Sequence, residues 1–205
     1  MSNLEAGVAV ANDGTGRPVL RRDAQRSIEK ITAAALELFT ERGLDCPLEE
    51  IARRAGVSPG TIYHRFGSRE ALIDAVAPDL AAAKLSRAID EAGAREGAWE
   101  RFYGYVEAIS FLMTTDAALS DAFARRYDDT PRLGAVCEEA LAHGAVLVKE
   151  AHESGELRDD FLVEDLMSIF LSVAAVSRSV PGAWRRALAF TLDGLRASAA
   201  PPPGP

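Results

Sequence analysis

The sequence predicts an all-α fold of about nine helices, and three observations carry this prediction. Between the two ends of the chain, apolar residues recur at intervals of three and four, which places them on one face of a helix. No stretch alternates apolar and polar residues as a half-buried strand does. Glycine and proline separate the periodic stretches and mark where each helix ends.

The N-terminal part is expected to contain an arm and two helices. Residues 1–20 are rich in Gly, Asn, Asp and Pro, which predicts a disordered arm. The first helix is expected to start near Asp23, a favourable N-cap, and to stop at Gly43. Pro47 then opens a short second helix that ends at Gly56.

A third short helix follows, with Ser58 as its N-cap, Pro59 at its first position and Phe66 at its end. Ser68 caps a longer fourth helix. Five more helices are expected at 98–114, 116–126, 130–153, 163–179 and 182–198. The chain then divides into the arm, a first domain over 21–72, a second helical domain over 73–198, and a disordered, proline-rich tail over 199–205.

Charge and composition limit the classes of partner. The net charge of −8 argues against indiscriminate binding to nucleic acid, yet residues 17–75 hold ten Lys and Arg against nine Asp and Glu, so this part suits a polyanion best. The apolar runs are too short for a membrane span and the N-terminus does not resemble a signal peptide. Cys46 and Cys137 are isolated and share no metal-ligand spacing, so we expect neither a disulfide framework nor a metal site, which fits the reducing cytoplasm. We also expect no cofactor and no membrane association.

Two helices that meet at a glycine turn are typical of a helix-turn-helix, whose second helix enters the major groove of DNA. Ala52 is small enough for a close crossing, Gly56 supplies the left-handed turn, and Ile62 points inward beneath it. The helix that would enter the groove runs from Pro59 to Phe66, and its eight residues span about 12 Å, which matches the width of the groove. The alternative is a hairpin used only for packing. The residues expected to face or clamp DNA are Ser58, Pro59, Gly60, Thr61, Tyr63, His64, Arg65, Ser68 and Arg69.

This region resembles the DNA-binding domain of the TetR/AcrR family of transcriptional regulators over residues 28–72. The resemblance implies base or phosphate contact by Thr61, and phosphate contact by Tyr63 and by Arg69, where the family usually has Lys. The matching residues are Ala34, Leu38, Phe39, Gly43, Ile51, Ala52, Ala55, Gly56, Val57, Ser58, Gly60, Thr61, Ile62, Tyr63, Phe66, Ser68, Glu70, Ala71 and Leu72.

The chain departs from the family pattern at two places. Cys46 and Pro47 stand where a Thr or Ser cap is common, and that hydroxyl is a frequent phosphate ligand in the family. Arg65 stands where His or Tyr is usual and adds a longer cationic side chain. The family arrangement also brings the end of the arm to DNA, although its arginines are equally compatible with solvation. These are Arg21, Arg22 and Arg26.

The resemblance further implies a C-terminal α-domain that dimerises through its last two helices and encloses a small-molecule pocket. The helix at 163–179 is apolar around most of its circumference and must be covered on two sides. A two-fold four-helix interface would cover it and would place two reading helices about 34 Å apart. The alternative is that both are core helices of a monomer. The interface residues we assign are Leu166, Phe170, Val173, Trp184, Leu188 and Leu192.

One face of the helix at 98–114, with residues that follow it, combines apolar surface with a few polar groups, as a small-molecule site requires. The same composition describes any hydrophobic core, and that alternative stays open. A redox-sensing role for the isolated Cys137 is a minor alternative. The pocket candidates are Phe102, Tyr105, Val106, Ile109, Met113, Phe123, Tyr127 and Cys137.

These features predict a homodimeric, ligand-responsive transcriptional repressor that leaves a palindromic DNA operator when a small-molecule effector binds. The alternative is a helical protein-interaction module without DNA binding, for which DNA association would be absent or insensitive to salt. The sequence contains no visible nucleophile and base pair, glycine-rich phosphate loop or metal set, so we do not expect an enzyme.

Overall fold

The computed structural model describes residues 16–124 and 129–197, with side chains from residue 23 onward. Within these ranges the chain forms nine α-helices, which confirms the all-α prediction. They are α1 (Gly16–Arg42), α2 (Leu48–Ala55), α3 (Pro59–Phe66), α4 (Arg69–Gly93), α5 (Ala98–Thr115), α6 (Ala117–Ala124), α7 (Pro131–Glu153), α8 (Asp165–Ser179) and α9 (Trp184–Gly194).

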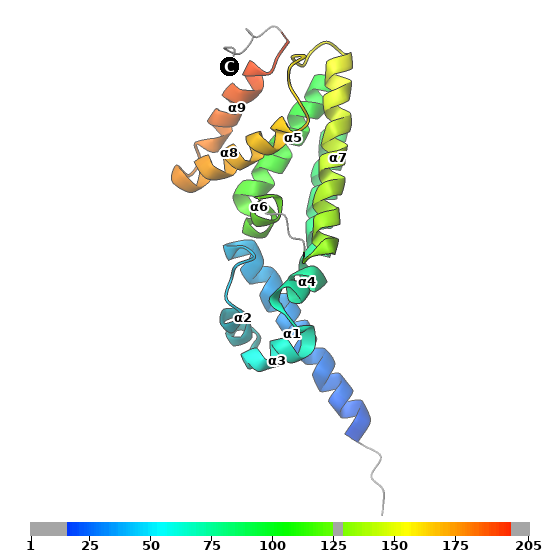
Figure 1. Ribbon diagram of the computed structural model, residues 1–205, viewed down its shortest axis with the longest axis vertical. Helices are drawn as coiled ribbons and strands as arrows, with labels where there is room; N and C mark the ends of the chain where they lie inside the picture. Colours follow the sequence, from blue (N-terminus) through cyan, green and yellow to red (C-terminus); the bar gives the residue numbers. More distant parts are fainter. Residues whose placement is uncertain (1–15, 125–128, 198–205) are drawn as a thin grey trace, which may run out of the picture.

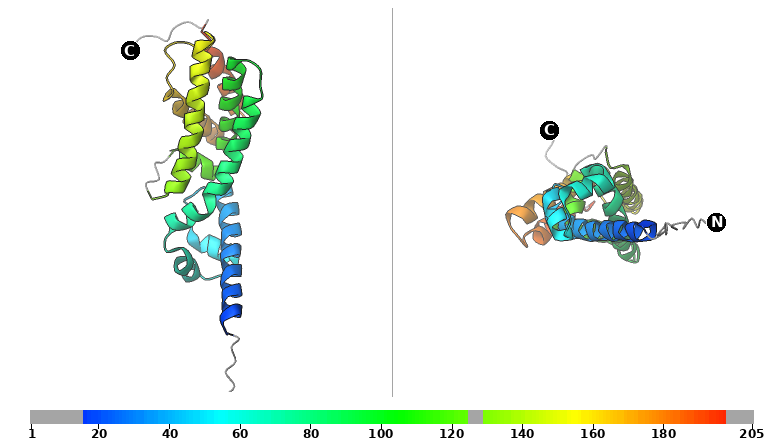
Figure 2. Two further views of the ribbon diagram at one scale, coloured as in Figure 1. Left: turned by 90° about the vertical axis from the view of Figure 1, so that its right-hand side faces the viewer. Right: turned by 90° about the horizontal axis from the view of Figure 1, so that it is seen from below.

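The helices form an elongated molecule with a small lower part and a larger upper part (Figure 1). α1, α2 and α3 make the lower part, and the N-terminal portion of α1 projects from it as a single rod. α4 begins in the lower part and runs upward beside α5 and α7, as the turned view also shows (Figure 2). α8 packs against α5 and α9 packs against α8, which completes the upper part. α4 is therefore the long element that both parts share.

The first helix differs from its predicted bounds. α1 begins at Gly16 rather than near Asp23, so residues 16–20 of the expected arm are helical. Pro18 is compatible with this start because N–H groups in the first turn of a helix have no acceptor within it. The predicted disorder of residues 1–15 and of the C-terminal tail falls outside the described residues.

The last helix is shorter than predicted and ends at Gly194 rather than 198. The backbone after it pairs with the segment between α7 and α8 instead. The N–H of Arg158 donates to the carbonyl of Leu195 at 3.0 Å, and the N–H of Ala197 donates to the carbonyl of Glu156 at 2.9 Å. Periodicity cannot reveal this pairing, because the partner is distant in sequence. The other predicted helices agree with the structure within two residues at each described end.

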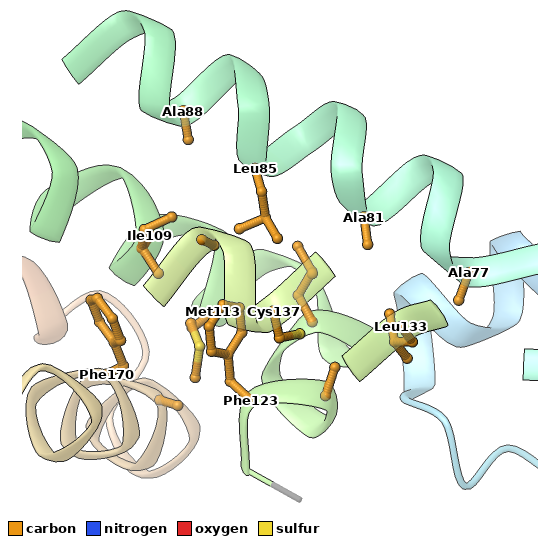
Figure 3. Close-up of a cluster of buried hydrophobic side chains, with 14 of the residues drawn as sticks. Ala77, Ala81, Leu85, Ala88, Ile109, Met113, Phe123, Leu133, Cys137 and Phe170 are labelled. Atoms are coloured by element: carbon orange, nitrogen blue, oxygen red, sulfur yellow. The ribbon is translucent and has the colours of Figure 1, made fainter. Parts of the chain in front are cut away.

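A single hydrophobic core runs through both parts. In the lower part its fully or nearly fully buried members come from α1 to α4, and they are Ile31, Leu38, Phe39, Ile51, Ile62 and Leu72. In the upper part α4, α5, α6, α7 and α8 surround the other portion of this core, a cluster drawn in Figure 3. It includes Leu85, Ile109, Met113, Phe123, Cys137 and Phe170. α4 contributes to both portions of the core and so joins the two parts by packing.

Candidate nucleic-acid interface

α2 and α3 meet at a glycine turn in the left-handed conformation. Gly56 has φ 68° and ψ 36°, and the N–H of Val57 donates to the carbonyl of Ala52 at 2.9 Å. A side chain at Gly56 would find no atom within 4 Å of its Cβ. The backbone conformation alone therefore favours glycine at this turn, as the sequence predicted.

α3 buries one face and exposes the other. Ile62 is fully buried, while Val57 and Phe66 pack partly buried against the same core. Thr61 lies half-buried at the edge of the outward face. The structure thus agrees with the predicted orientation of this helix. The exposed residues are Pro59, Gly60, Tyr63, His64 and Arg65, of which Tyr63 is 52% exposed.

The hydroxyl groups near the N-termini of α3 and α4 take part in capping. The Ser58 Oγ accepts from the Thr61 N–H at 3.3 Å and lies 2.9 Å from the Thr61 Oγ1. The Ser68 Oγ accepts from the Ala71 N–H at 3.0 Å. Both serines are caps, as expected from the sequence. A hydroxyl that accepts a capping bond keeps its own proton to donate, so the cap leaves Ser68 able to bind a phosphate oxygen.

Arg69 has a structural role that the sequence did not indicate. Its Nη1 donates to the carbonyl oxygens of Leu44, at 3.1 Å, and Cys46, at 2.6 Å. Both acceptors belong to the loop between α1 and α2, so the guanidinium holds this loop onto the start of α4. The guanidinium of arginine has five N–H groups, and those of Arg69 that do not bond the loop stay available to a phosphate. The predicted phosphate contact of Arg69 therefore stays a prediction.

The family departure at Cys46 and Pro47 leaves α2 without a side-chain cap. The Cys46 thiol is instead buried, and burial, followed by the nearby Glu50 carboxylate, raises its pKa. A protonated, buried thiol is an apolar filler of the core rather than a phosphate ligand.

Arginines around α2 and α3 differ in how far they are neutralised. Arg42 pairs with Glu50, and Arg54 pairs with Glu37 at 2.7 Å. In the described part of the chain, neither Arg53 nor Arg65 has an ion-pair partner, and both are exposed. Arg53 was missed as a candidate because it is not among the residues that match the family pattern, although it lies within residues 28–72. Its place in the last turn of α2, next to the glycine turn, is the signal that could have found it.

The loop after α1 is also bound by α6. The Asp121 Oδ2 accepts from the Leu44 N–H at 2.9 Å, across 77 positions of sequence. Gly43 has φ 89°, and a Cβ placed there would collide with the same carboxylate. Glycine at 43 is therefore favoured by backbone conformation and by the close approach of Asp121. This contact links the helix-turn-helix to the upper part of the molecule.

Most residues predicted to line a small-molecule pocket converge in the upper part. Ile109, Met113, Phe123 and Cys137 point toward one another among α5, α6 and α7 (Figure 3). These four are at most 7% exposed, and Phe102, Tyr105 and Val106 are fully buried. Tyr127 lies outside the described residues. The packing is that of a core, the alternative the sequence left open, and ligand binding among these residues stays a prediction.

Polar groups in this region are few. The Tyr105 O–H donates to the carbonyl of Ala140 at 2.8 Å, and burial raises the pKa of Tyr105. The Ser110 Oγ is buried without a hydrogen-bond partner among the described residues. Burial raises the pKa of the Cys137 thiol to about 11. Such a thiol is protonated near neutral pH, which argues against redox sensing, because the thiolate is the reactive form.

The six residues predicted for a dimer interface lie inside the protomer. Each is at most 5% exposed, and Phe170, for example, makes edge contacts with the rings of Tyr105 and Phe123. Within one protomer these apolar stripes cover the chain's own core, and their part in a dimer interface stays a prediction. The buried residues are Leu166, Phe170, Val173, Trp184, Leu188 and Leu192.

The outer side of α8 and α9 nevertheless carries apolar surface. A groove of about 360 Å³ lies between them, and its lining includes Ile169, Val176 and Ala187. Leu171 and Phe190, on the same two helices, are 39% and 63% exposed. These side chains lie on the surface of the protomer, where a partner could contact them.

Two further findings concern other kinds of site. Across residues 16–124 and 129–197, no helix is long and apolar enough to cross a membrane. The same part of the chain contains no group of three or more His, Cys, Asp or Glu placed to hold a metal ion.

Two family models match the chain. Residues 31–76 match the model described as bacterial regulatory proteins, tetR family. Residues 96–197 match the model of the C-terminal domain of SbtR-like transcriptional regulators. The first match contains the helix-turn-helix, and the second contains α5 to α9.

Curated relatives match part of the chain. The HTH-type transcriptional regulator YvdT of Bacillus subtilis is 36% identical over 90 residues, which cover 42% of this chain and 44% of that protein. The HTH-type transcriptional regulator UidR of Escherichia coli is 40% identical over 58 residues, which cover 28% of this chain and 30% of that protein. The matched segments thus span less than half of these relatives.

Solved structures extend the similarity over most of the chain. A TetR transcriptional regulator from Streptomyces coelicolor is 32% identical with a TM-score of 0.52, over 84% of this chain and 99% of that one. FadR of Bacillus subtilis, solved with stearoyl-CoA, is 17% identical with a TM-score of 0.63, over 84% and 99%. RolR, solved with resorcinol, is 20% identical with a TM-score of 0.57, over 87% and 91%. The last two similarities concern the fold alone.

Proposed function

Because the chain belongs to the TetR family of bacterial DNA-binding transcriptional regulators, we propose that it is a homodimeric repressor that leaves a palindromic operator when a small molecule binds. The observation that carries the proposal is the outward face of α3. Eight residues long, this helix spans about 12 Å and fits a major groove of about the same width.

The side chains around α3 divide into two roles. Tyr63, His64 and Arg65 project from the helix and reach base edges or phosphates. Gly60 lets the backbone approach the bases closely. Ser68 and Arg69, at the start of α4, are placed to bind the DNA backbone through the hydroxyl and the free N–H groups of the guanidinium.

Dimerisation supports operator reading, because one short helix contacts few bases. Two copies related by a two-fold axis read half-sites about 34 Å apart, which gives a palindrome. The outer side of α8 and α9 suits such a contact, since it combines the groove of about 360 Å³ with the exposed Leu171 and Phe190. Burying these side chains in a second copy removes them from water.

The cluster of Figure 3 is the best-supported place for an effector. It is apolar and buried, and the Ser110 hydroxyl, which has no hydrogen-bond partner among the described residues, lies buried on α5, one of its helices. Two proteins of the same fold were solved with organic ligands, stearoyl-CoA and resorcinol, which supports the ligand class in general terms. A ligand has to separate these packed side chains to enter, and that separation displaces the surrounding helices.

A displacement of α6 has a direct route to the helix-turn-helix. α6 follows Asp116, whose Oδ1 accepts from the Leu119 N–H at 3.0 Å and whose carboxylate also pairs with Lys84 of α4. α6 also carries Asp121, which accepts from the Leu44 N–H in the loop before α2. Moving α6 therefore shifts the spacing of the two α3 helices, which lowers the population that fits the operator.

The experiment is fluorescence anisotropy of the purified protein with labelled DNA fragments flanking its own gene, with random DNA of equal length, at two salt concentrations. We expect selective binding that weakens as salt rises. Arg65→Ala should weaken DNA binding by tenfold or more. Arg87→Ala, which removes one exposed charge from α4 in the upper part of the molecule, should not.

Three outcomes would contradict the proposal. Binding that is absent or independent of salt would favour the helical protein-interaction module. Equal losses of DNA affinity in Arg65→Ala and Arg87→Ala would show that binding depends on net charge and not on contacts made by α3. A monomeric complex with DNA would exclude the two-fold reading of a palindrome.

A further inference from the structure

A groove of about 590 Å³ lies on the flank of the upper part, between α4, α5 and the start of α9. Its apolar floor includes Ala88 of α4 and Ala108 and Leu112 of α5. Phe111, which is 44% exposed, and Trp184 stand at the α9 end, with ring centroids 6.3 Å apart. The groove thus combines an apolar floor with an accessible aromatic ring.

The groove is also cationic in a chain of net charge −8. Four basic side chains and three carboxylates line it. Three of the basic groups are already paired, since Lys84 contacts Asp116, Arg87 contacts Glu91 at 2.8 Å, and Arg95 contacts Glu107 at 3.0 Å. Among the described residues, the fourth, Arg185, has no carboxylate within ion-pair distance, so one positive charge in the groove is left over.

Aromatic rings hold this free guanidinium in place. The Arg185 Cζ lies 4.5 Å from the ring centroid of Trp184 and 5.8 Å from that of Phe111. Stacking on a ring leaves the edges of the guanidinium plane free, and its paired N–H groups match the two oxygens of a carboxylate. A planar anion that meets this edge would place its apolar body against Phe111.

The groove opens on a different surface from the sites considered above. On α9, Arg185 lies about 160° around the helix axis from Ala187, which lines the groove between α8 and α9. The cluster in Figure 3 shares Ala88 with the floor of this groove, but Arg87 and Phe111 lie on exposed faces of α4 and α5. A molecule in this groove therefore needs neither an opened core nor a displaced partner.

We propose that this groove is a binding site for small aromatic carboxylates, with the ring on Phe111 and the carboxylate on Arg185. The size, the accessible ring and the single unpaired cation favour this class over neutral or cationic molecules. The site goes beyond the proposed repressor function, and its occupancy can be measured on the free protein without DNA.

The test is isothermal titration calorimetry of the full-length protein with 2-naphthoate, and with 2-naphthamide as a neutral ligand of the same shape. We expect saturable binding of one naphthoate per chain and binding of the amide at least tenfold weaker. Arg185→Gln should weaken naphthoate binding at least tenfold. Its matched control is Arg186→Gln, because Arg186 stacks on Phe190 instead and does not line the groove. The control should bind naphthoate like the wild type.

Each contrary result overturns the proposal. No heat of saturable binding would show that the groove does not take this class. Equal affinities for naphthoate and naphthamide, or an unchanged affinity in Arg185→Gln, would place the molecule elsewhere, such as in the core between α5 and α7. A lower molecular mass of the free Arg185→Gln protein in solution would assign the groove to a second copy of the chain. None of these results depends on whether the protein binds an operator.

Discussion

The carbonyl oxygen of Asp74 accepts a hydrogen bond from the Arg132 guanidinium, with 2.9 Å between Nη1 and the oxygen. Pro78 lies inside α4 and has no N–H, so it cannot supply the helical donor to this carbonyl four residues earlier. In return the Asp74 carboxylate accepts from the backbone N–H groups of Arg132 and Leu133 at 2.8 and 3.1 Å. α7 thus repairs a defect in α4, and α4 caps α7.

Arg132→Ala should lower the free energy of unfolding by about 1 kcal/mol, because it leaves the Asp74 carbonyl without a donor. In a Pro78→Ala background the loss should be smaller, since an alanine at that position donates its own N–H. Urea denaturation of the wild type, both single variants and the double variant measures this coupling. The same loss in both backgrounds would contradict the proposed repair. Arg87→Ala, whose side chain is 82% exposed, is the control for loss of a surface charge.

Arg69→Ala should destabilise the protein in the absence of DNA. The side chain bonds the carbonyls of Leu44 and Cys46, so its removal releases the loop between α1 and α2. A loss of about 1–2 kcal/mol in the free energy of unfolding is expected for hydrogen bonds from a charged donor. Arg65→Ala, at an exposed position on α3, should change stability by less than about 0.5 kcal/mol. If urea denaturation gives Arg69→Ala the wild-type stability, these hydrogen bonds do not stabilise the loop.

Gly60→Ala should separate stability from DNA binding. Gly60 lies within α3, and its nearest neighbour, the Ser58 Oγ, is 3.8 Å from the position of an added Cβ. Alanine should therefore raise the free energy of unfolding by about 0.5–1 kcal/mol. The same methyl group would stand between α3 and the bases, so operator affinity should fall.

The matched control is Gly134→Ala in α7, where no atom lies within 4 Å of the added Cβ. It should also stabilise the fold, yet leave operator affinity unchanged. Thermal unfolding and fluorescence anisotropy measure the two properties. If Gly60→Ala binds the operator as tightly as Gly134→Ala, the backbone of α3 does not approach DNA closely.

The helix-turn-helix could be predicted because its determinants are local. Gly56 requires a left-handed backbone, while Ser58 and Ser68 cap the helices that follow them within three residues. Each such signal acts over one turn of chain, so sequence spacing is enough to find it. The outward placement of Tyr63 and His64 follows from the same spacing once Ile62 is known to point inward.

Contacts between distant segments could not be predicted in the same way. The bond from Leu44 to Asp121 spans 77 positions, and the bond from Arg69 to Leu44 spans 25. The polarity of Asp121 and Arg69 does not show which distant residue each of them bonds. The prediction of the dimer residues meets a related limit, because an amphipathic stripe shows that Leu166 and Leu188 must be covered but not what covers them. Here the chain's own α5 and its neighbours do so.

Phe190→Glu should weaken the proposed dimer. Phe190 is 63% exposed on α9, and a carboxylate there would have to be desolvated against a second copy in place of an apolar ring. Leu162→Glu, at a residue 59% exposed before α8, is the control on stability and charge. Sedimentation velocity should give a dimer for the wild type and the control, and a dissociation constant at least tenfold higher for Phe190→Glu. A monomeric wild type would refute dimerisation, and a wild-type dissociation constant for Phe190→Glu would place the interface elsewhere.

The stability of the protein should fall as pH rises from about 9 to 11, in part because of Cys137. Burial, followed by the charge of Glu138, raises the pKa of this thiol from 9.0 to about 11. Below pH 9 the thiol is protonated in both states, so its contribution is constant. Between pH 9 and 11 the unfolded chain releases the proton while the folded chain keeps it, which favours unfolding. Cys137→Ala removes the contribution of this thiol, so the free energy of unfolding of the variant should fall less steeply over the same pH range. Urea denaturation under reducing conditions from pH 7 to 10.5 tests it, and parallel curves for the wild type and the variant would show that Cys137 ionises equally in both states.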